Sequence, residues 1–213
     1  FASGSGTTQL VFQYTIQATG TSGENDDNGI SIPANAIALN SGTIKDVAGN
    51  DGILTHSLVD NNSSYKVDTI LPAVSSVAIT SAEGIQNNLL NATDNVSVTA
   101  TFSETVNVSG NPTLTLVVGN TNKASSYTSG DNSTQLVFRY TIQSGDNDTN
   151  GISIPANAFV LNSGTIRDPA GNDGTLTHSL VDNNSSYKVD TTVPSVNSFT
   201  MNDTELKIGD NAT

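Results

Sequence analysis

The chain contains a long internal repeat, and this repeat limits the folds open to it more than any other feature. Residues 8–17 recur at 134–143 with one difference, and residues 30–68 recur at 152–190 with 34 identities in 39 positions. The offset is 126 residues for the first block and 122 for the second, because the intervening loop is four residues longer in the first copy. A unit of about 120 residues has the size of one small domain.

The phase of the repeat predicts one complete unit between two partial ones. Residues 1–68 match only the second half of the unit, and residues 69–190 make up a complete copy. Residues 191–213 open with the pattern that opens the complete copy, so we expect them to start a third unit. The chain is therefore interpreted as an excised stretch of a longer tandem array.

Apolar residues alternate with polar ones along several segments, as they do in half-buried strands. In residues 136–142, for example, Leu136, Phe138, Tyr140 and Ile142 share one face. The same alternation occurs in residues 10–16, 96–102 and 114–118. No segment shows a convincing helical period. Seven or so short strands in one unit predict an all-β fold built as a two-sheet antiparallel β-sandwich.

The charge balance excludes several classes of function. Seven Lys and Arg against twenty Asp and Glu give a formal net charge of −13. A nucleic-acid binder, or a protein that attaches to anionic membranes, needs a basic face. The chain has no cysteine, so it forms neither disulfides nor thiolate metal sites. It also lacks a run of eighteen apolar residues, so we expect no membrane insertion.

No arrangement of residues predicts catalysis. His56 and His178 occupy the same position in different repeats, so they are not expected to share a site. We find no nucleophile elbow, no P-loop and no dinucleotide fingerprint. The sequence therefore predicts that the protein is not an enzyme.

One loop has the spacing of a calcium-binding loop. Asp146, Asp148 and Asn150 stand at alternate positions and are followed by Gly151, which gives the pattern D-x-D-x-N-G. The corresponding residues of the first copy are Glu24, Asp26 and Asn28. The alternative interpretation is a solvated hairpin turn rich in Asn and Asp.

Four motifs carry a resemblance to a known family. They are Asp-Thr-Ile-Leu-Pro at 68–72, Thr-Phe-Ser-Glu at 101–104, Gly-Thr-Ile-Arg-Asp-Pro-Ala-Gly-Asn at 164–172 and Asp-Thr-Thr-Val-Pro at 190–194. In this order and spacing they resemble the bacterial Ig-like tandem repeats of giant surface adhesins, including biofilm-associated and RTX-type adhesins. The resemblance implies tandem Ig-like sandwiches in a secreted protein of the bacterial cell surface, commonly stabilised by calcium. It implies no ligand.

A second candidate calcium site follows from this fold. In an Ig-like sandwich the incoming linker lies near the loop after the second strand and the loop before the last. We therefore expect Ca²⁺ to be bound where these three segments meet, by Asp68, Glu104, Asp168, Asn172 and Asp173. Asp190 is the equivalent residue of the next junction, and the loop of the first copy contains Asp46, Asn50 and Asp51. The alternative is that Asp168 caps a turn and Asn172 stands at a hairpin tip.

Two functions from different classes agree with these patterns. The first is an extracellular spacer, or stalk, whose repeats contact the neighbouring repeats of the same chain. Such a stalk would project a distal binding region, whose ligand is unknown, and would serve cell adhesion or biofilm formation. The second is an Ig-like module that binds glycan or protein through its loops, where residues 18–29 differ from residues 144–151.

Residues 1–68 also need a partner for their open sheet edges. We expect either a strand-swapped homodimer or a permuted domain formed from residues 1 to about 128.

Overall fold

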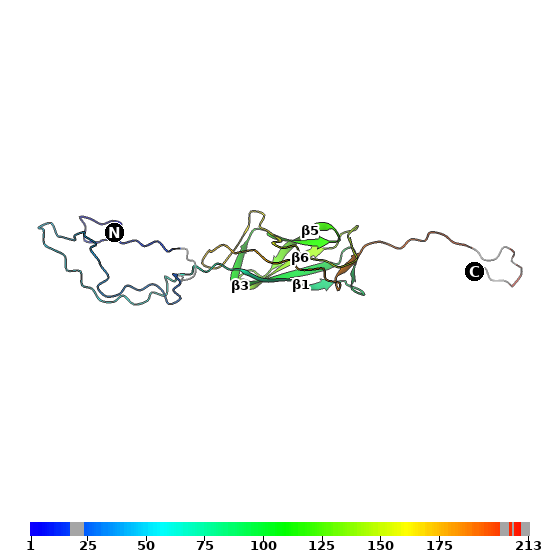
Figure 1. Cartoon of the computed structure of the whole chain (residues 1–213), viewed down its shortest axis with the longest axis horizontal. Helices are drawn as coiled ribbons and strands as arrows, with labels where there is room; N and C mark the ends of the chain where they lie inside the picture. Colours follow the sequence, from blue (N-terminus) through cyan, green and yellow to red (C-terminus); the bar gives the residue numbers. More distant parts are fainter. Residues whose placement is uncertain (18–23, 201–204, 206, 210–213) are drawn as a thin grey trace.

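A computed structural model describes residues 1–17, 24–200, 205 and 207–209. These residues form an all-β protein without helices, and so none of them belongs to a helix that could span a membrane. The named strands lie in one body between residues 74 and 190 (Figure 1). They are β1 (Val74–Glu83), β2 (Leu89–Leu90), β3 (Asn95–Ser109), β4 (Thr113–Val118), β5 (Thr121–Ser129), β6 (Ser133–Thr141), β7 (Asn147–Asp148), β8 (Phe159–Val160), β9 (Thr165–Arg167) and β10 (Lys188–Asp190).

The strands make two sheets. The larger has the order β1-β3-β6-β5-β4-β8, with β9 added to the far part of β3, and all its pairs are antiparallel. The smaller has the order β2-β10-β7, and here β10 runs parallel to β2 and antiparallel to β7. This arrangement confirms the predicted all-β class and is consistent with a β-sandwich. The tandem Ig-like topology stays a prediction.

The core lies where the sequence alternation predicts it. Leu136, Phe138 and Ile142 on and after β6 are fully or almost fully buried. Apolar residues of β3 and β4 pack against them in a single cluster, which includes Val96, Val98, Ala100, Phe102, Leu114 and Leu116. The antiparallel pairing of β3 with β6 places these alternating faces together, so hydrophobic burial holds the two halves of the repeat to each other.

Residues 1–68 do not form the strand that the alternation at 10–16 predicts. They make an open arrangement at the N-terminal end of the molecule (Figure 1), in which the described residues have isolated bridges and no named strand. Most of their large apolar side chains are exposed. The physical reason is the lack of strand neighbours, because a strand is stabilised by cross-strand pairs, and in the complete copy these come from β3 on one side and β5 on the other.

The geometry argues against the permuted domain. Asp68 corresponds to Asp190, which pairs with Asn147 at the same end of the body as Glu83. In a permuted domain the chain would have to pass from that end to Val74 at the far end of β1. The ten residues of β1 span about 33 Å. The six residue steps from Asp68 to Val74 reach only about 20 Å. The linker is therefore too short, while the strand-swapped homodimer stays an untested prediction.

Candidate metal centre

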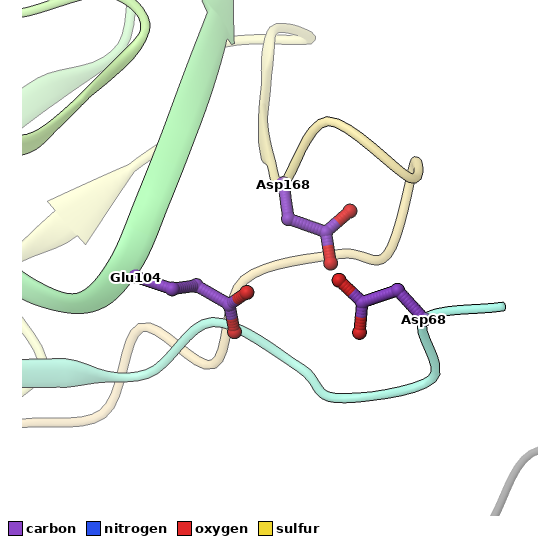
Figure 2. Close-up of side chains that lie close together, drawn as sticks. All are labelled: Asp68, Glu104 and Asp168. Atoms are coloured by element: carbon purple, nitrogen blue, oxygen red, sulfur yellow. The ribbon is translucent and has the colours of Figure 1, made fainter. Parts of the chain in front are cut away.

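Three carboxylates from different parts of the chain meet at the junction between residues 1–68 and the β-body. Asp68, Glu104 and Asp168 each offer one carboxylate oxygen, and these oxygens all lie within 4.8 Å of one another. Figure 2 shows the three side chains pointing toward a common space. Within the described part of the chain this is the single group of three or more His, Cys, Asp or Glu side chains with such spacing.

The linker is held beside the body by backbone hydrogen bonds on both sides. Thr175 N donates to Pro72 O (2.7 Å), and Val74 N donates to Thr175 O (3.1 Å). On the other side Ser103 N donates to Ala73 O (2.8 Å). The linker therefore lies between β3 and the segment that follows β9, which brings Asp68 to the other two carboxylates.

An irregularity in β3 positions Glu104. Thr101 pairs with Gln135, but the next pair joins Val106 to Ser133, so four residues of β3 face a single residue of β6. Such bulges interrupt the ladder and redirect side chains. Glu104 stands inside this interruption, at the edge where the linker arrives.

Asp168 organises a tight loop and belongs to the cluster at the same time. Its Oδ1 accepts hydrogen bonds from Gly171 N (2.7 Å) and Asn172 N (2.9 Å), as the turn-capping interpretation predicts. The Asn172 amide nitrogen donates to Asp168 Oδ2 (2.7 Å) and to the backbone oxygen of Asp68 (3.1 Å). Asn172 thus ties the loop to the linker through its nitrogen, next to the carboxylates.

The cluster lacks positive charge. None of the four ion pairs found among the described residues involves Asp68, Glu104 or Asp168. Glu104 Oε1 is buried and has no hydrogen-bond partner. Burial raises the pKa of the Glu104 carboxyl, and the charges of Asp68 and Asp168 raise it further. A buried, unpartnered carboxylate oxygen is costly unless a ligand compensates it.

The structure does not bring Asp173 into this group. Its carboxylate accepts a hydrogen bond from Arg167 Nε at 2.6 Å and is largely exposed. The guanidinium of Arg167 lowers the pKa of Asp173, first through that hydrogen bond and then through its charge. In the first copy Lys45 pairs with Asp51 in the same way, at 2.5 Å. Asp173 and Asp51 are therefore surface ion-pair partners.

The equivalent loop of the first copy folds in the same way without making a cluster. Asp46 Oδ1 accepts from Asn50 N, and Asp46 Oδ2 accepts from the Asn50 amide, both at 2.8 Å. These hydrogen bonds lower the pKa of Asp46, the Asn50 side chain having the largest effect. At the next junction Asp190 Oδ1 accepts from Thr192 N (2.9 Å), as Asp68 Oδ1 accepts from Ile70 N (3.0 Å).

In the predicted calcium loop at residues 146–151, the first acidic residue already has ion-pair and hydrogen-bond partners within the protein. Asp146 is buried and forms an ion pair with Lys123 at 2.7 Å. Its other oxygen accepts from the Tyr140 hydroxyl (2.6 Å) and from Gln143 N (2.9 Å). Burial favours a raised pKa for Asp146, but the hydrogen bonds from Lys123, Tyr140 and Gln143 outweigh it and lower the pKa. No motif in the sequence links Lys123 to this loop.

The second acidic residue of that loop is also fully engaged. Asp148 Oδ1 accepts from Gly151 N (2.8 Å) and Asn150 N (3.1 Å), and Asp148 Oδ2 accepts from Gly119 N (2.7 Å). Asn150 itself is exposed. The loop therefore has the hydrogen bonds of the alternative interpretation, an Asx turn. It differs from the junction in that Lys123 already supplies a positive charge to Asp146. Calcium binding by this loop stays a prediction.

The first copy of the loop repeats this pattern. Asp26 Oδ1 accepts from Gly29 N (2.8 Å) and Asn28 N (3.1 Å). Glu24 accepts hydrogen bonds from the Tyr14 hydroxyl and from Gln17 N. Residues 18–23 of the variable loop lie outside the described residues. In both copies, therefore, the acidic residues of this loop form hydrogen bonds within their own half of the repeat or with Lys123 and Gly119.

Searches with protein-family models, among curated proteins and among solved structures found no match to this chain. The three-carboxylate junction, with the neighbouring Asn172, is thus the feature from which a function can be argued. Its donors are hard oxygen atoms from three separate segments. Such a set can bind a divalent cation and, through it, join the linker to the body.

Proposed function

We propose that the protein is a structural spacer in an extracellular tandem array, a stalk module of a bacterial surface adhesin whose repeat junctions are stiffened by Ca²⁺. The observation that carries the proposal is the junction of Asp68, Glu104 and Asp168, with the buried Glu104 Oε1 left without a partner. The near-identical repeats and the adhesin-like motifs support the tandem array and the cell-surface setting.

The residues of the junction fit calcium better than the other common metals. Ca²⁺ takes six to eight oxygen ligands and tolerates irregular geometry, whereas Zn²⁺ sites are built mainly with Cys and His. The cluster contains three carboxylates and neither of those residues. Backbone oxygens of Asp68 and Ile70 lie close by, since both contact the Asn172 amide nitrogen. When bound, the ion supplies the positive charge that the cluster lacks.

A cation at this place would act on the angle between successive units. Asp68 belongs to the linker, Glu104 to β3 and Asp168 to the loop after β9. Binding all three at once removes the freedom of the linker to rotate against the body. A row of such junctions makes an extended array resist bending, which is what a stalk needs in order to hold a distal region away from a surface.

Calcium titration of the metal-free chain tests the proposal. We expect one site per chain in isothermal titration calorimetry, because one cluster of this kind occurs in the described residues. We also expect a higher melting temperature in Ca²⁺ than in EDTA, because calcium that binds only the folded state increases the free energy of unfolding. In small-angle X-ray scattering the distribution of overall dimensions should narrow on calcium addition.

The variant Asp173→Asn is the matched control, because it removes a carboxylate from the same loop outside the cluster. It should bind calcium as the wild type does. An unchanged melting temperature in calcium, or calcium binding that Asp148→Asn abolishes, would contradict the proposed junction site.

A further inference from the structure

The first copy holds the linker, residues 68–73, through an asparagine side chain. Asn25 Oδ1 accepts hydrogen bonds from Thr69 N at 2.7 Å and from the Thr69 hydroxyl at 2.9 Å. The corresponding residues of the complete copy make the same backbone contact, since Asn147 Oδ1 accepts from Thr191 N at 3.1 Å. In both copies, therefore, the residue after the junction aspartate is held by the side-chain oxygen of an asparagine from the same loop.

The β-body holds the same linker through an asparagine nitrogen. The Asn172 amide nitrogen donates to the backbone oxygens of Asp68 (3.1 Å) and Ile70 (3.3 Å). It also donates to Asp168 Oδ2 at 2.7 Å. Calcium is bound by oxygen atoms, so this nitrogen acts on the linker and not on an ion.

The two asparagines act on opposite edges of the linker. Asp68 O and Thr69 N belong to one peptide group, and the C=O and N–H of a trans peptide point in opposite directions. The oxygen is held by Asn172 and the nitrogen by Asn25. Contacts on both edges restrain the linker more than either contact alone, because together they stop it from turning about its own axis.

We propose that Asn25 and Asn172 are positioning residues, which dock the linker between the two units in the absence of any cation. The docked linker brings the Asp68 carboxylate to the other two carboxylates of the junction, within 4.8 Å. The docking itself is independent of calcium. Its effect on calcium affinity rests on the function proposed above.

Docking the linker beforehand lowers the cost of binding a cation. Asp68 is exposed and carries the same charge as the other two residues of the cluster, so without the two asparagines it is repelled from them. A site whose competent form is populated only in part binds with an affinity reduced by that fraction. Loss of either asparagine should therefore weaken calcium binding, although the substitution removes no carboxylate.

Amide hydrogen exchange of the full chain in EDTA at pH 7, followed by NMR, tests the docking. In Asn25→Ala the Thr69 amide should exchange at least about tenfold faster than in the wild type, because its acceptor is lost. Asn25→Asp should keep the slow exchange, since a carboxylate oxygen accepts the same hydrogen bonds. The outcome at position 172 should be the opposite. Asn172→Asp should loosen the Thr69 amide as much as Asn172→Ala does, because neither side chain has a donor for the linker oxygens.

Asn50→Ala is the matched control. Asn50 is the counterpart of Asn172, and its side-chain nitrogen donates to Asp46 Oδ2 at 2.8 Å, with no bond to the linker among the described residues. This variant should leave exchange of the Thr69 amide unchanged. The amides of residues 136–140 should stay protected in every variant, which verifies that the body is folded.

Calorimetric titration with calcium tests the effect on the site. Asn25→Ala should raise the dissociation constant at least about threefold, and Asn25→Asp should restore it. Equal exchange of the Thr69 amide in the wild type and both alanine variants would overturn the docking, as would its rescue by Asn172→Asp. Faster exchange with an unchanged dissociation constant would overturn the positioning role. If the wild type binds no calcium, the proposed function fails, while the exchange rates still decide the docking.

Discussion

Replacing Glu104 with glutamine should reverse the usual effect of removing a charged residue, because it should stabilise the metal-free protein. The three carboxylate oxygens lie within 4.8 Å of one another. Two unit charges at that distance repel by about 3 kcal/mol at an effective dielectric constant of 20, and by about 1 kcal/mol in water. Glu104→Gln removes two of the three repulsive pairs. Because Asp68 is exposed and Glu104 is only half-buried, we take the screened value of about 1 kcal/mol for each of the two pairs and expect a gain of about 2 kcal/mol in all.

Thermal unfolding in EDTA and in calcium measures this effect. In EDTA the variant should melt higher than the wild type, by roughly 6–10 °C for a domain of this size. In saturating calcium the order should reverse, because the wild type gains binding energy, about 2.7 kcal/mol at one hundred times the dissociation constant, and the variant loses most of it. The crossing of the two curves is the signature of a cation site.

The pH dependence of stability provides a second test that the charge of Glu104 destabilises the metal-free protein. The pKa of Glu104 is raised in the folded state, so at a pH between the unfolded and the folded pKa the folded protein binds more protons than the unfolded chain. Its contribution to stability is complete below the unfolded pKa and is lost as the pH rises through the raised pKa. In EDTA, acidification from neutral pH should therefore stabilise the wild type more than Glu104→Gln. A variant that melts lower than the wild type in EDTA would refute the repulsion argument.

Three further changes test the body itself. Tyr140→Phe removes a donor to Asp146 and should cost about 1–3 kcal/mol in urea unfolding at neutral pH; because the pKa of Asp146 is lowered, this cost should fade as the pH drops below the ordinary aspartate value. Gly151→Ala should cost about 1–3 kcal/mol or more by the same assay, since φ is +103° and the added Cβ would lie 2.0 Å from Asn184 O. Phe138→Ala should cost about 3–5 kcal/mol in calorimetry, because Phe138 is fully buried.

The sequence predicts the class of fold well because alternation reports burial directly. Residues 136–142 read as a half-buried strand, and the structure buries the face that the pattern selects. The same pattern at residues 10–16 forms no strand. Alternation indicates which side chains are suited to burial, but it does not indicate whether a core is present to bury them. Strand formation at that place depends on a partner that no local pattern can report.

For the candidate site, too, the sequence predicts some of the contacts and misses others. The structure brings Asp68, Glu104 and Asp168 together, and the sequence motifs predicted this meeting. Asp173 does not belong to it, and a signal was available: a basic residue stands six positions before this aspartate in both copies. The engagement of Asp146 by Lys123 was not foreseeable, because Lys123 comes from a strand that no shared motif connects to the loop.

A comparison of the two copies distinguishes the loop conformation, which is local, from the carboxylate cluster, which requires the junction. Asp46 and Asp168 accept the same hydrogen bonds from the asparagine four residues later, so the loop conformation is a local property. Only Asp168 has the linker and β3 beside it, and only there do three carboxylates converge among the described residues. Since the loop is saturated by its own donors in both copies, it has no need of a cation by itself. The unbalanced negative charge arises when the linker brings Asp68 to Glu104, so the proposed cation site belongs to the joint between units, and we expect cation binding to report that the joint has formed.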